Sequence, residues 1–216
     1  MTPIKNIIFD FGGVLSDLDF QGCLEGLVGL GYPREKLTKE FVMTGVFQKM
    51  DLGTISTEEF WEELRRTSHR PDVGDEEWRA VWNSILLGIP KQRYEALREL
   101  RKGYRLFLLS NISDPHWEYT VQNLAQYGGE CFLDWFERVF LSFQMHLEKP
   151  DTGIFKKVLE ETGISAAETL FVDDRGDNIQ GARRTGLVGL QAIGDEWIAP
   201  LVGKELYAED FKNESH

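Results

Sequence analysis

Residues 7–15, IIFDFGGVL, decide the fold of this chain. A compact apolar run leads to Asp10 and then to Gly12 and Gly13, where the backbone can turn tightly. The pattern predicts a buried strand over residues 5–14 with an acid near its carboxyl end. Ligands of open parallel sheets bind at that edge. We therefore expect Asp10 to lie in a binding crevice.

Further along the chain, other short segments place polar side chains in a similar setting. They are LFLLSN at 106–111, EKPD at 148–151 and LFVDDRGDN at 170–178. Two of them end an apolar run with a hydroxyl or with acids, at the point where a strand would reach the ligand edge. A carboxylate, a hydroxyl, an ammonium and an acidic pair would then meet in one crevice, as a phosphate-transfer site requires.

The remaining pattern alternates strands with helices, which implies right-handed βαβ units and a parallel sheet of the α/β class. Apart from the helix at 117–125, the predicted helices are bounded by a proline, a capping residue or a glycine. We expect strands at 105–109, 138–142, 169–173 and 187–192, and helices from Pro90 to Gly103 and at 117–125, 152–162 and 178–185.

A helical block interrupts the sheet after its first strand. Residues 20–87 repeat apolar side chains at helical spacing, and nothing in them indicates a strand. We therefore divide the chain into a core of residues 1–16 and 91–216 and an all-helical cap of residues 17–90, placed to cover the site like a lid. Substrate choice is expected in this cap, although most of its aromatic and Met side chains should form its core, among them Phe47, Met50, Trp61 and Trp82.

Composition narrows the classes of partner. The chain has 216 residues, 42% of them hydrophobic, and a net charge of −12. This charge argues against nucleic acid and anionic membrane as partners, and an anionic substrate would need a cation to reverse the sign locally. We expect no signal peptide, no membrane span and no obligate protein partner. Two separated cysteines, Cys23 and Cys131, indicate free thiols in the cytoplasm.

The acids have two readings each. Asp10 is either a turn residue or a nucleophile that attacks phosphorus and forms an aspartyl-phosphate. Asp173 and Asp174 are either helix N-terminal acids or ligands of Mg²⁺, because two adjacent carboxylates after a buried strand repel each other unless a cation compensates. With Asp10 and the backbone carbonyl of Gly12, one acid of this pair would complete a Mg²⁺ shell.

The remaining candidates suit a phosphoryl group. The hydroxyl of Ser110 and the amides that follow it, including that of Asn111, could bind phosphate oxygens, and Gly12 and Gly13 would let the backbone approach closely. The ammonium of Lys149 could neutralise phosphate and shield Asp10 from its charged target. Each signal is weak alone, since strand-end serines and surface lysines are common. The set is much stronger than its members.

In this order, the four segments resemble the signatures of the haloacid dehalogenase (HAD) superfamily of Mg²⁺-dependent phosphohydrolases, over nearly the whole chain. SNISDPH and VDDRGDN look most like the subgroup of α-glucose-1-phosphate phosphatases and epoxide hydrolase phosphatase domains. The resemblance implies a Rossmann-like sheet with a helical cap. It also implies that Asp10 is nucleophile and metal ligand, that Gly12 and Asp174 bind Mg²⁺ with Asp173 beside them, and that Ser110, Asn111 and Lys149 hold the phosphoryl group.

One departure from the family pattern matters. Most of its phosphatases carry a second Asp two residues after the nucleophile, as a general acid and base, and this chain has Gly12 there. Loss of such a group costs about 10²–10⁴ in rate. Three consequences stay open: a preference for good leaving groups such as a sugar C1 oxygen, a substitute acid, or a silent phosphate binder. His116 is the first candidate substitute, followed by Asp17 and Asp19.

Other functional classes agree less well with the pattern. A two-component receiver domain has its acidic pair first and its lysine last, and it is shorter. A haloacid dehalogenase would use the same nucleophile on carbon and would leave the acids of VDD without a role. We therefore expect a Mg²⁺-dependent hydrolase of a small phosphorylated metabolite, with a sugar phosphate among the candidates. The natural substrate and the oligomeric state are not encoded in any motif found here.

Overall fold

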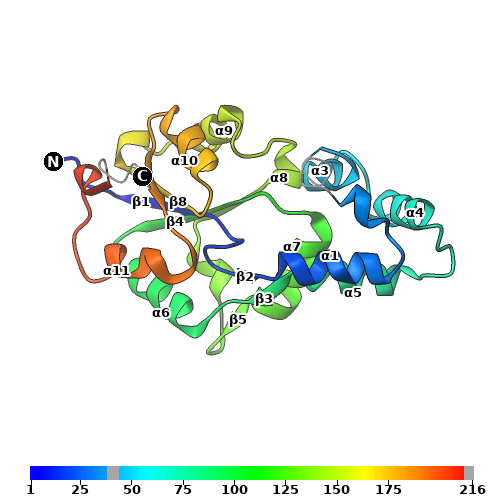
Figure 1. Ribbon diagram of the computed structural model, residues 1–216. Coiled ribbons are helices and arrows are strands. Elements are labelled where there is room, and N and C mark those ends of the chain that lie inside the picture. Colours follow the sequence, from blue (N-terminus) through cyan, green and yellow to red (C-terminus); the bar gives the residue numbers. More distant parts are fainter. Residues whose placement is uncertain (38–43, 212–216) are drawn as a thin grey trace.

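The computed structural model describes residues 1–37 and 44–211, and its centre is a five-stranded parallel sheet (Figure 1). The spatial order of the strands is β7-β4-β1-β8-β9. The first strand therefore lies in the middle, with the strands that carry the later motifs beside it, as a doubly wound sheet requires. Their bounds are β1 Asn6–Phe9, β4 Arg105–Ser110, β7 Arg138–Leu141, β8 Thr169–Asp173 and β9 Val188–Gln191.

The central strands are apolar on both faces, because each face is covered by helices. In β1, Ile7 and Phe9 belong to one cluster of buried side chains and Ile8 to another. β4 and β8 divide their side chains in the same alternating way, as the two-residue period of a strand dictates. The predicted α/β class with a parallel sheet is confirmed.

Figure 1 shows the two helical layers on either side of the sheet. α9 (Thr152–Thr162) and α10 (Gly176–Arg183) cover one face, and α6 (Lys91–Leu100) and α11 (Ile198–Leu201) cover the other. α9 begins at Asp151, which accepts a hydrogen bond from the amide of Gly153, and it ends at Gly163 in the left-handed conformation. Short 3₁₀ segments complete this part of the fold at Phe132–Trp135, Ala166–Glu168, Gly194–Trp197 and Ala208–Phe211.

The inserted block lies beside the sheet and has a core of its own. Its helix α4 (Thr57–Ser68) opens with a capping box between Ser56 and Glu59. The buried cluster inside it contains Phe47, Met50, Trp61 and Trp82, so the expectation that these side chains form a core is confirmed. The helices are α1 Phe20–Gly29, α3 Val46–Asp51, α4 Thr57–Ser68 and α5 Asp75–Asn83, with a 3₁₀ turn at Arg34–Lys36.

Several predicted boundaries were wrong. β1 ends at Phe9, so the strand does not continue to residue 14. The inserted block is not purely helical, because β3 (Leu86–Gly88) at its end pairs antiparallel with β2 (Asp17–Leu18) at its start. These two short strands bring the beginning and the end of the insertion together, which the helical periodicity of the residues between them did not reveal.

The region after β4 also differs from the prediction. α7 (Asp114–Tyr119) begins before residue 117 and continues as a π-helix over Thr120–Leu124. A small hairpin of β5 (Gln126–Tyr127) and β6 (Glu130–Cys131) follows it. The short helix α8 (Ser142–Met145) directly follows β7. None of the helices in the described residues is long and apolar enough to cross a membrane.

The carboxyl end of α3 is fastened to the core next to the ligand edge of the sheet. The hydroxyl of Ser142 donates to the backbone oxygen of Asp51 at 2.6 Å, and Nδ1 of His146 lies 2.8 Å from the backbone oxygen of Leu52. Gly53 has a φ of +61°, and a Cβ there would lie 2.2 Å from the carbonyl oxygen of Phe143. Only glycine fits this close approach, so the end of α3 has a fixed place over the sheet edge.

Candidate active site at the carboxyl edge of the sheet

Three acids gather where β1 and β8 end. The two strands are parallel neighbours with Phe9 opposite Val172, so Asp10 and Asp173 follow side by side. Carboxylate oxygens of Asp10, Asp173 and Asp174 lie within 4.8 Å of one another. The acids that the sequence placed in separate motifs therefore form one cluster.

Lys149 lies against this cluster and is only 3% exposed. Its Nζ is 2.7 Å from Oδ1 of Asp10 and 2.7 Å from Oδ2 of Asp173, and it also donates to the backbone oxygen of Leu109 at 3.1 Å. The side chain of Asn111 fixes the backbone of Lys149 by donating to its carbonyl and accepting from its amide, both at 2.9 Å. The ammonium is thus held in place before any substrate binds.

The two oxygens of Asp10 are not equivalent. Oδ1 accepts from the backbone amide of Phe11 at 2.7 Å and contacts Lys149. Within residues 1–37 and 44–211, Oδ2 has no hydrogen-bond partner. One oxygen therefore orients the carboxylate, and the other is available to a ligand or to an electrophile.

The charges of the cluster do not balance. Burial lowers the pKa of Lys149, but Asp10 and Asp173 raise it more, so the ammonium stays charged. Burial raises the pKa of Asp10; Lys149 opposes this effect, whereas repulsion from Asp173 and Asp174 adds to it. The pKa of Asp174 is raised by burial and by Asp173 as well. Three carboxylates against one ammonium suit a bound divalent cation, which prefers hard oxygen ligands.

The adjacent acids Asp173 and Asp174 have different surroundings. Asp173 is fully buried, and besides Lys149 its oxygens accept from the side-chain amide of Asn178 at 2.9 and 3.1 Å and from the backbone amide of Arg175 at 2.9 Å. Asp174 is half-buried and lines the cavity described below. Asp173 thus holds the lysine, while Asp174 faces the ligand space.

Glycine is required beside Asp174. Gly13 has a φ of +78°, and a Cβ at this position would lie 2.8 Å from Oδ2 of Asp174. On the other side of Asp10, Ser110 ends β4 and is buried, and no residue within 1–37 and 44–211 hydrogen-bonds its hydroxyl. The structure therefore brings Ser110, Asn111, Gly12 and Gly13 to the same sheet edge as the acids.

A cavity of about 260 Å³ opens over these residues, and the inserted block contributes part of its wall. From the sheet edge come Asp10, Gly12, Asn111, Glu148, Lys149, Asp174, Arg175 and Asn178, and from residues 17–90 come Leu18, Phe20, Gln48, Asp51 and Ile85. Gln48 donates to the carboxylate of Glu148 and so ties α3 to the EKPD motif. The sequence analysis predicted that the inserted block contributes to substrate choice, but it did not predict which of its residues line the cavity.

Asp51 left one signal in the sequence. It ends α3, where the partial negative charge of a helix disfavours an acid. The interaction of an acid with the carboxyl end of a helix is unfavourable, so the helix itself gives no reason for Asp51 to be there, two residues before Gly53. Sequence reasoning did not use this signal.

The three candidate substitutes for the missing acid do not line the cavity, and each of them interacts with another part of the protein. The His116 ring stacks on Trp82 with centroids 4.7 Å apart, its Nε2 is 2.9 Å from the backbone oxygen of Trp82, and burial lowers its pKa to about 4. Asp17 pairs with the guanidinium of Arg93 at 2.7 Å. Asp19 caps α1. None of the three lines the cavity, so we do not retain them as acids.

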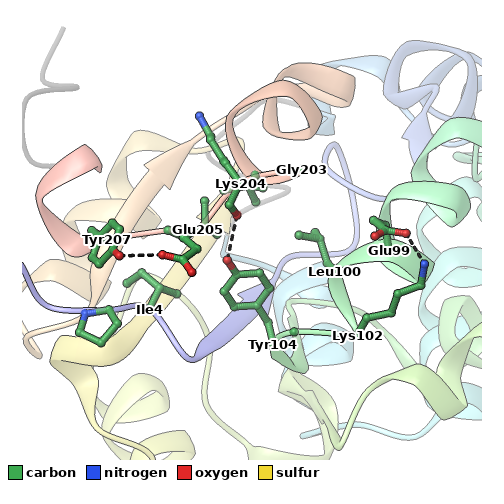
Figure 2. A pocket seen from close by; sticks show the side chains of 13 residues that line it. Ile4, Glu99, Leu100, Lys102, Tyr104, Gly203, Lys204, Glu205 and Tyr207 are labelled. Carbon is green, nitrogen blue, oxygen red and sulfur yellow. Dashed lines mark hydrogen bonds and ion pairs between the residues drawn. The ribbon is translucent and has the colours of Figure 1, made fainter.

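A larger cavity, of about 600 Å³, lies at the opposite edge of the sheet (Figure 2). It is lined by residues that precede β1 and β4 and by the segment after α11. Several of its polar groups are paired with one another: the hydroxyl of Tyr104 donates to the backbone oxygen of Lys204 at 3.1 Å, and Tyr207 donates to Glu205 at 2.8 Å. None of the four motifs reaches it, so its size does not make it the site.

Comparisons with known proteins agree with this geometry. A family model described as haloacid dehalogenase-like hydrolase matches residues 4–186. A D-ribitol-5-phosphate phosphatase of Bacteroides thetaiotaomicron is 29% identical over 90% of this chain and 95% of its own length. A sesquiterpene phosphatase of Aspergillus oryzae is 29% identical over 88% and 90%.

Among solved structures, a HAD-family enzyme from Bacteroides thetaiotaomicron superimposes with a TM-score of 0.85 and 34% identity. The match covers 91% of this chain and 98% of that one, and that crystal contains magnesium and inorganic phosphate. The likeness therefore extends over both the sheet and the inserted block.

Proposed function

Given that the chain belongs to the haloacid dehalogenase-like hydrolases and is a phosphatase of that family, we propose that it hydrolyses a small phosphomonoester in two steps through an aspartyl-phosphate on Asp10. One observation carries this proposal. The carboxylate of Asp10 is oriented by an ammonium at 2.7 Å on one oxygen, its other oxygen has no hydrogen-bond partner within the described residues, and Asp10 lines the same cavity as Asp174 and Asn111. This is the arrangement of an activated, positioned nucleophile.

We propose Mg²⁺ as the cofactor, because the donor set consists of hard oxygens with surplus negative charge. Asp10, Asp174 and the backbone carbonyl of Gly12 would hold it. The role of Asp173 as a further ligand stays a prediction, since its oxygens already accept from Lys149, Asn178 and Arg175. When bound, the ion supplies positive charge that attracts the phosphoryl group and offsets the charge that develops during transfer.

The side chains of this chain perform the remaining work. Asp10 attacks phosphorus with the oxygen that has no hydrogen-bond partner within the described residues. Lys149 keeps the carboxylate aligned and neutralises a phosphoryl oxygen as the charged target approaches. Ser110 and the amides after it would donate to the other phosphoryl oxygens. Asn111 fixes the backbone of Lys149, so this ammonium needs no reorganisation during turnover.

The cavity of about 260 Å³ suits a small leaving group. Its wall combines the polar side chains of Gln48 and Asp51 with apolar Leu18, Phe20 and Ile85. The relative that acts on D-ribitol 5-phosphate matches nearly the whole chain, so we favour polyol and sugar phosphates as substrates. The resemblance to α-glucose-1-phosphate phosphatases stays a prediction, as do a cytoplasmic location and the absence of nucleic-acid, membrane and obligate protein partners.

The test is hydrolysis of p-nitrophenyl phosphate with Mg²⁺ and after its removal by EDTA, together with trapping by fluoroberyllate. Turnover should require the ion, and beryllium fluoride should bind on Asp10 in a crystal soak. Turnover that persists in EDTA would contradict the metal assignment. Absent turnover with tight phosphate binding would instead show a silent binder. Release of halide from 2-chloropropionate would point to a dehalogenase.

A further inference from the structure

The leaving oxygen of the substrate needs a proton, and the usual position of the donor is empty here. Gly12 has no side chain, and the space beside it is occupied by Leu18, whose Cδ1 would lie 3.1 Å from a Cβ at this position. Arg175 in the cavity wall pairs with Asp177 at 2.6 Å, and Lys149 pairs with Asp10 and Asp173. The proton must therefore come from another group that lines the cavity.

Asp51 is the carboxylic acid with the right surroundings. It ends α3, is half-buried and lines the cavity on the side of the inserted block. Within residues 1–37 and 44–211, no group donates a hydrogen bond to its carboxylate. Its backbone is nevertheless fixed, because Ser142 donates to its carbonyl at 2.6 Å and Gly53 packs on Phe143. A carboxylate that lines a cavity on an anchored backbone and lacks a donor is available to a ligand.

The electrostatic surroundings favour the neutral form of this acid. Burial raises the pKa of Asp51 to about 7, and the nearby carboxylate of Glu148 adds to the effect. The end of the α3 dipole acts in the same direction. Two titratable groups of the core lie at this end of α3: Glu148, which accepts a hydrogen bond from Gln48, and His146, which contacts the backbone oxygen of Leu52. The neighbouring helix α8 contains no titratable side chain. Near neutral pH, such an acid holds a proton that it can give away.

We propose that Asp51 is the general acid and base of the reaction and replaces the side chain missing at Gly12. This inference rests on the proposed phosphatase function and deepens it. It also assigns the inserted block a chemical role, since the nucleophile comes from the sheet and the proton donor from the cap. The end of α3, anchored over the sheet edge, thereby completes the active site.

The two steps balance as follows. Asp10 attacks phosphorus, the bond from phosphorus to the leaving oxygen breaks, and the proton of Asp51 moves to that oxygen, which leaves as an alcohol. Asp51 is now a carboxylate. It takes a proton from a water molecule whose oxygen attacks phosphorus, the bond from phosphorus to Asp10 breaks, and phosphate departs. Both acids return to their starting states, and one water is consumed.

The experiment compares leaving groups in wild type and Asp51→Asn. An alkyl phosphate, chosen as the best substrate among ribitol 5-phosphate, glycerol phosphates and glucose phosphates, needs the proton, whereas p-nitrophenol leaves without one. In Asp51→Asn, kcat/KM for the alkyl phosphate should fall by about 10²–10⁴, and that for p-nitrophenyl phosphate by less than about fivefold. Equal losses on both substrates, or no loss on the alkyl phosphate, would overturn the proposal.

Matched variants separate this result from other causes. Asp19→Asn changes a nearby acid to an equally good helix cap and should leave the leaving-group preference unaltered. Gly12→Asp in the Asp51→Asn background should recover at least tenfold of the alkyl activity, because Leu18 is flexible and can move aside. In wild type the alkyl kcat/KM should decline above about pH 7, and Asp51→Asn should lack this decline. A decline that persists in Asp51→Asn would count against the proposal.

The failure of this proposal can be told apart from failure of the phosphatase mechanism. If Asp10→Asn abolishes Mg²⁺-dependent turnover of p-nitrophenyl phosphate while Asp51→Asn treats both substrates alike, the nucleophile stands and only the proton donor is wrong. If Asp10→Asn stays active, the mechanism itself is wrong. Turnover of p-nitrophenyl phosphate also reports that Asp51→Asn is folded, and an unchanged circular dichroism spectrum reports this for Asp10→Asn.

Discussion

The carboxyl edge of the sheet and the end of α3 both line the same cavity, but the acids at these two places have different hydrogen-bond partners. At the sheet edge, Asp10 and Asp173 are tied to Lys149 at 2.7 Å, and Asp173 accepts three further hydrogen bonds. At the end of α3, the carboxylate of Asp51 has no donor within the described residues. The sheet edge is preorganised, whereas the cap presents a group that is free to exchange a proton.

This difference indicates how the chain divides the chemistry between its two parts. Phosphoryl transfer depends on fixed charges, which a rigid sheet edge supplies. Protonation of the leaving oxygen depends on the alcohol being released, and the cap contributes its own side chains to the cavity wall next to that group. Four substitutions test this division between the sheet edge and the cap.

Asp10→Asn should have the largest effect, because it removes the nucleophile without changing its shape. We expect kcat for p-nitrophenyl phosphate to fall by at least about 10⁴, with an unchanged circular dichroism spectrum. Steady-state kinetics at saturating Mg²⁺ measures this. A loss of less than tenfold would show that the sheet edge does not supply the nucleophile.

Lys149→Met should damage both chemistry and stability. We expect kcat to fall by about 10²–10³, since a preorganised positive charge is lost. The free energy of unfolding should fall by about 3–5 kcal/mol, because Asp10 and Asp173 would lose their buried partner. Urea denaturation and steady-state kinetics give the two values. Full stability in the variant would mean that the acids are not held as the structure shows.

Leu64→Ala tests whether the buried core of the cap affects stability alone or also the preference for the leaving group. Leu64 is fully buried in the cluster of the inserted block, so its truncation should lower the free energy of unfolding by about 2–5 kcal/mol. The ratio of kcat/KM for alkyl and aryl phosphates should stay within about threefold of wild type at a temperature where the variant is folded. A changed ratio would show that the packing of the cap, rather than Asp51 alone, controls the leaving group.

Asp51→Asn should give the smallest and most diagnostic stability effect. The pKa of Asp51 is about 7 in the folded protein against an ordinary value of 3.8, so the unfolded chain loses this proton first as pH rises. The free energy of unfolding of wild type, relative to that of Asp51→Asn, should therefore decrease as pH rises from about 4 to 7. Above about pH 7 the difference between the two proteins should stay constant. We expect a difference of about 1–2 kcal/mol, reduced by partial exposure to solvent. Urea denaturation at several pH values would reveal it, and a difference that does not vary with pH would contradict the raised pKa.

Much of the sheet and of its ligand edge could be predicted, because both depend on local patterns. A buried strand alternates its side chains between two faces, and a polar residue at its carboxyl end marks the site. Ser110 and Asp173 lie at the ends of β4 and β8, and Asp10 directly follows β1, as the motifs indicated. Lys149 was found through its motif alone, and its contacts with Asp10 and Asp173 depend on the loop before α9.

The cap side of the cavity could not be predicted in the same way. His116 follows the phosphate motif closely, but it stacks on Trp82 of the inserted block and does not line the cavity. Leu18 and Ile85 line the cavity because β2 and β3 bring the ends of the insertion together. Such contacts join segments far apart in the chain, and no local pattern encodes them.

Local patterns in the sequence establish the class of fold, the succession of strands along the chain and the acids at the sheet edge, since strand periodicity and backbone turns are properties of neighbouring residues. Which acid outside the sheet lines the cavity depends instead on contacts between segments far apart in the chain. Asp51 faces the cavity because Ser142 and Phe143 anchor the end of α3 over the sheet, and its raised pKa exists only in the folded chain, where burial and Glu148 act on it.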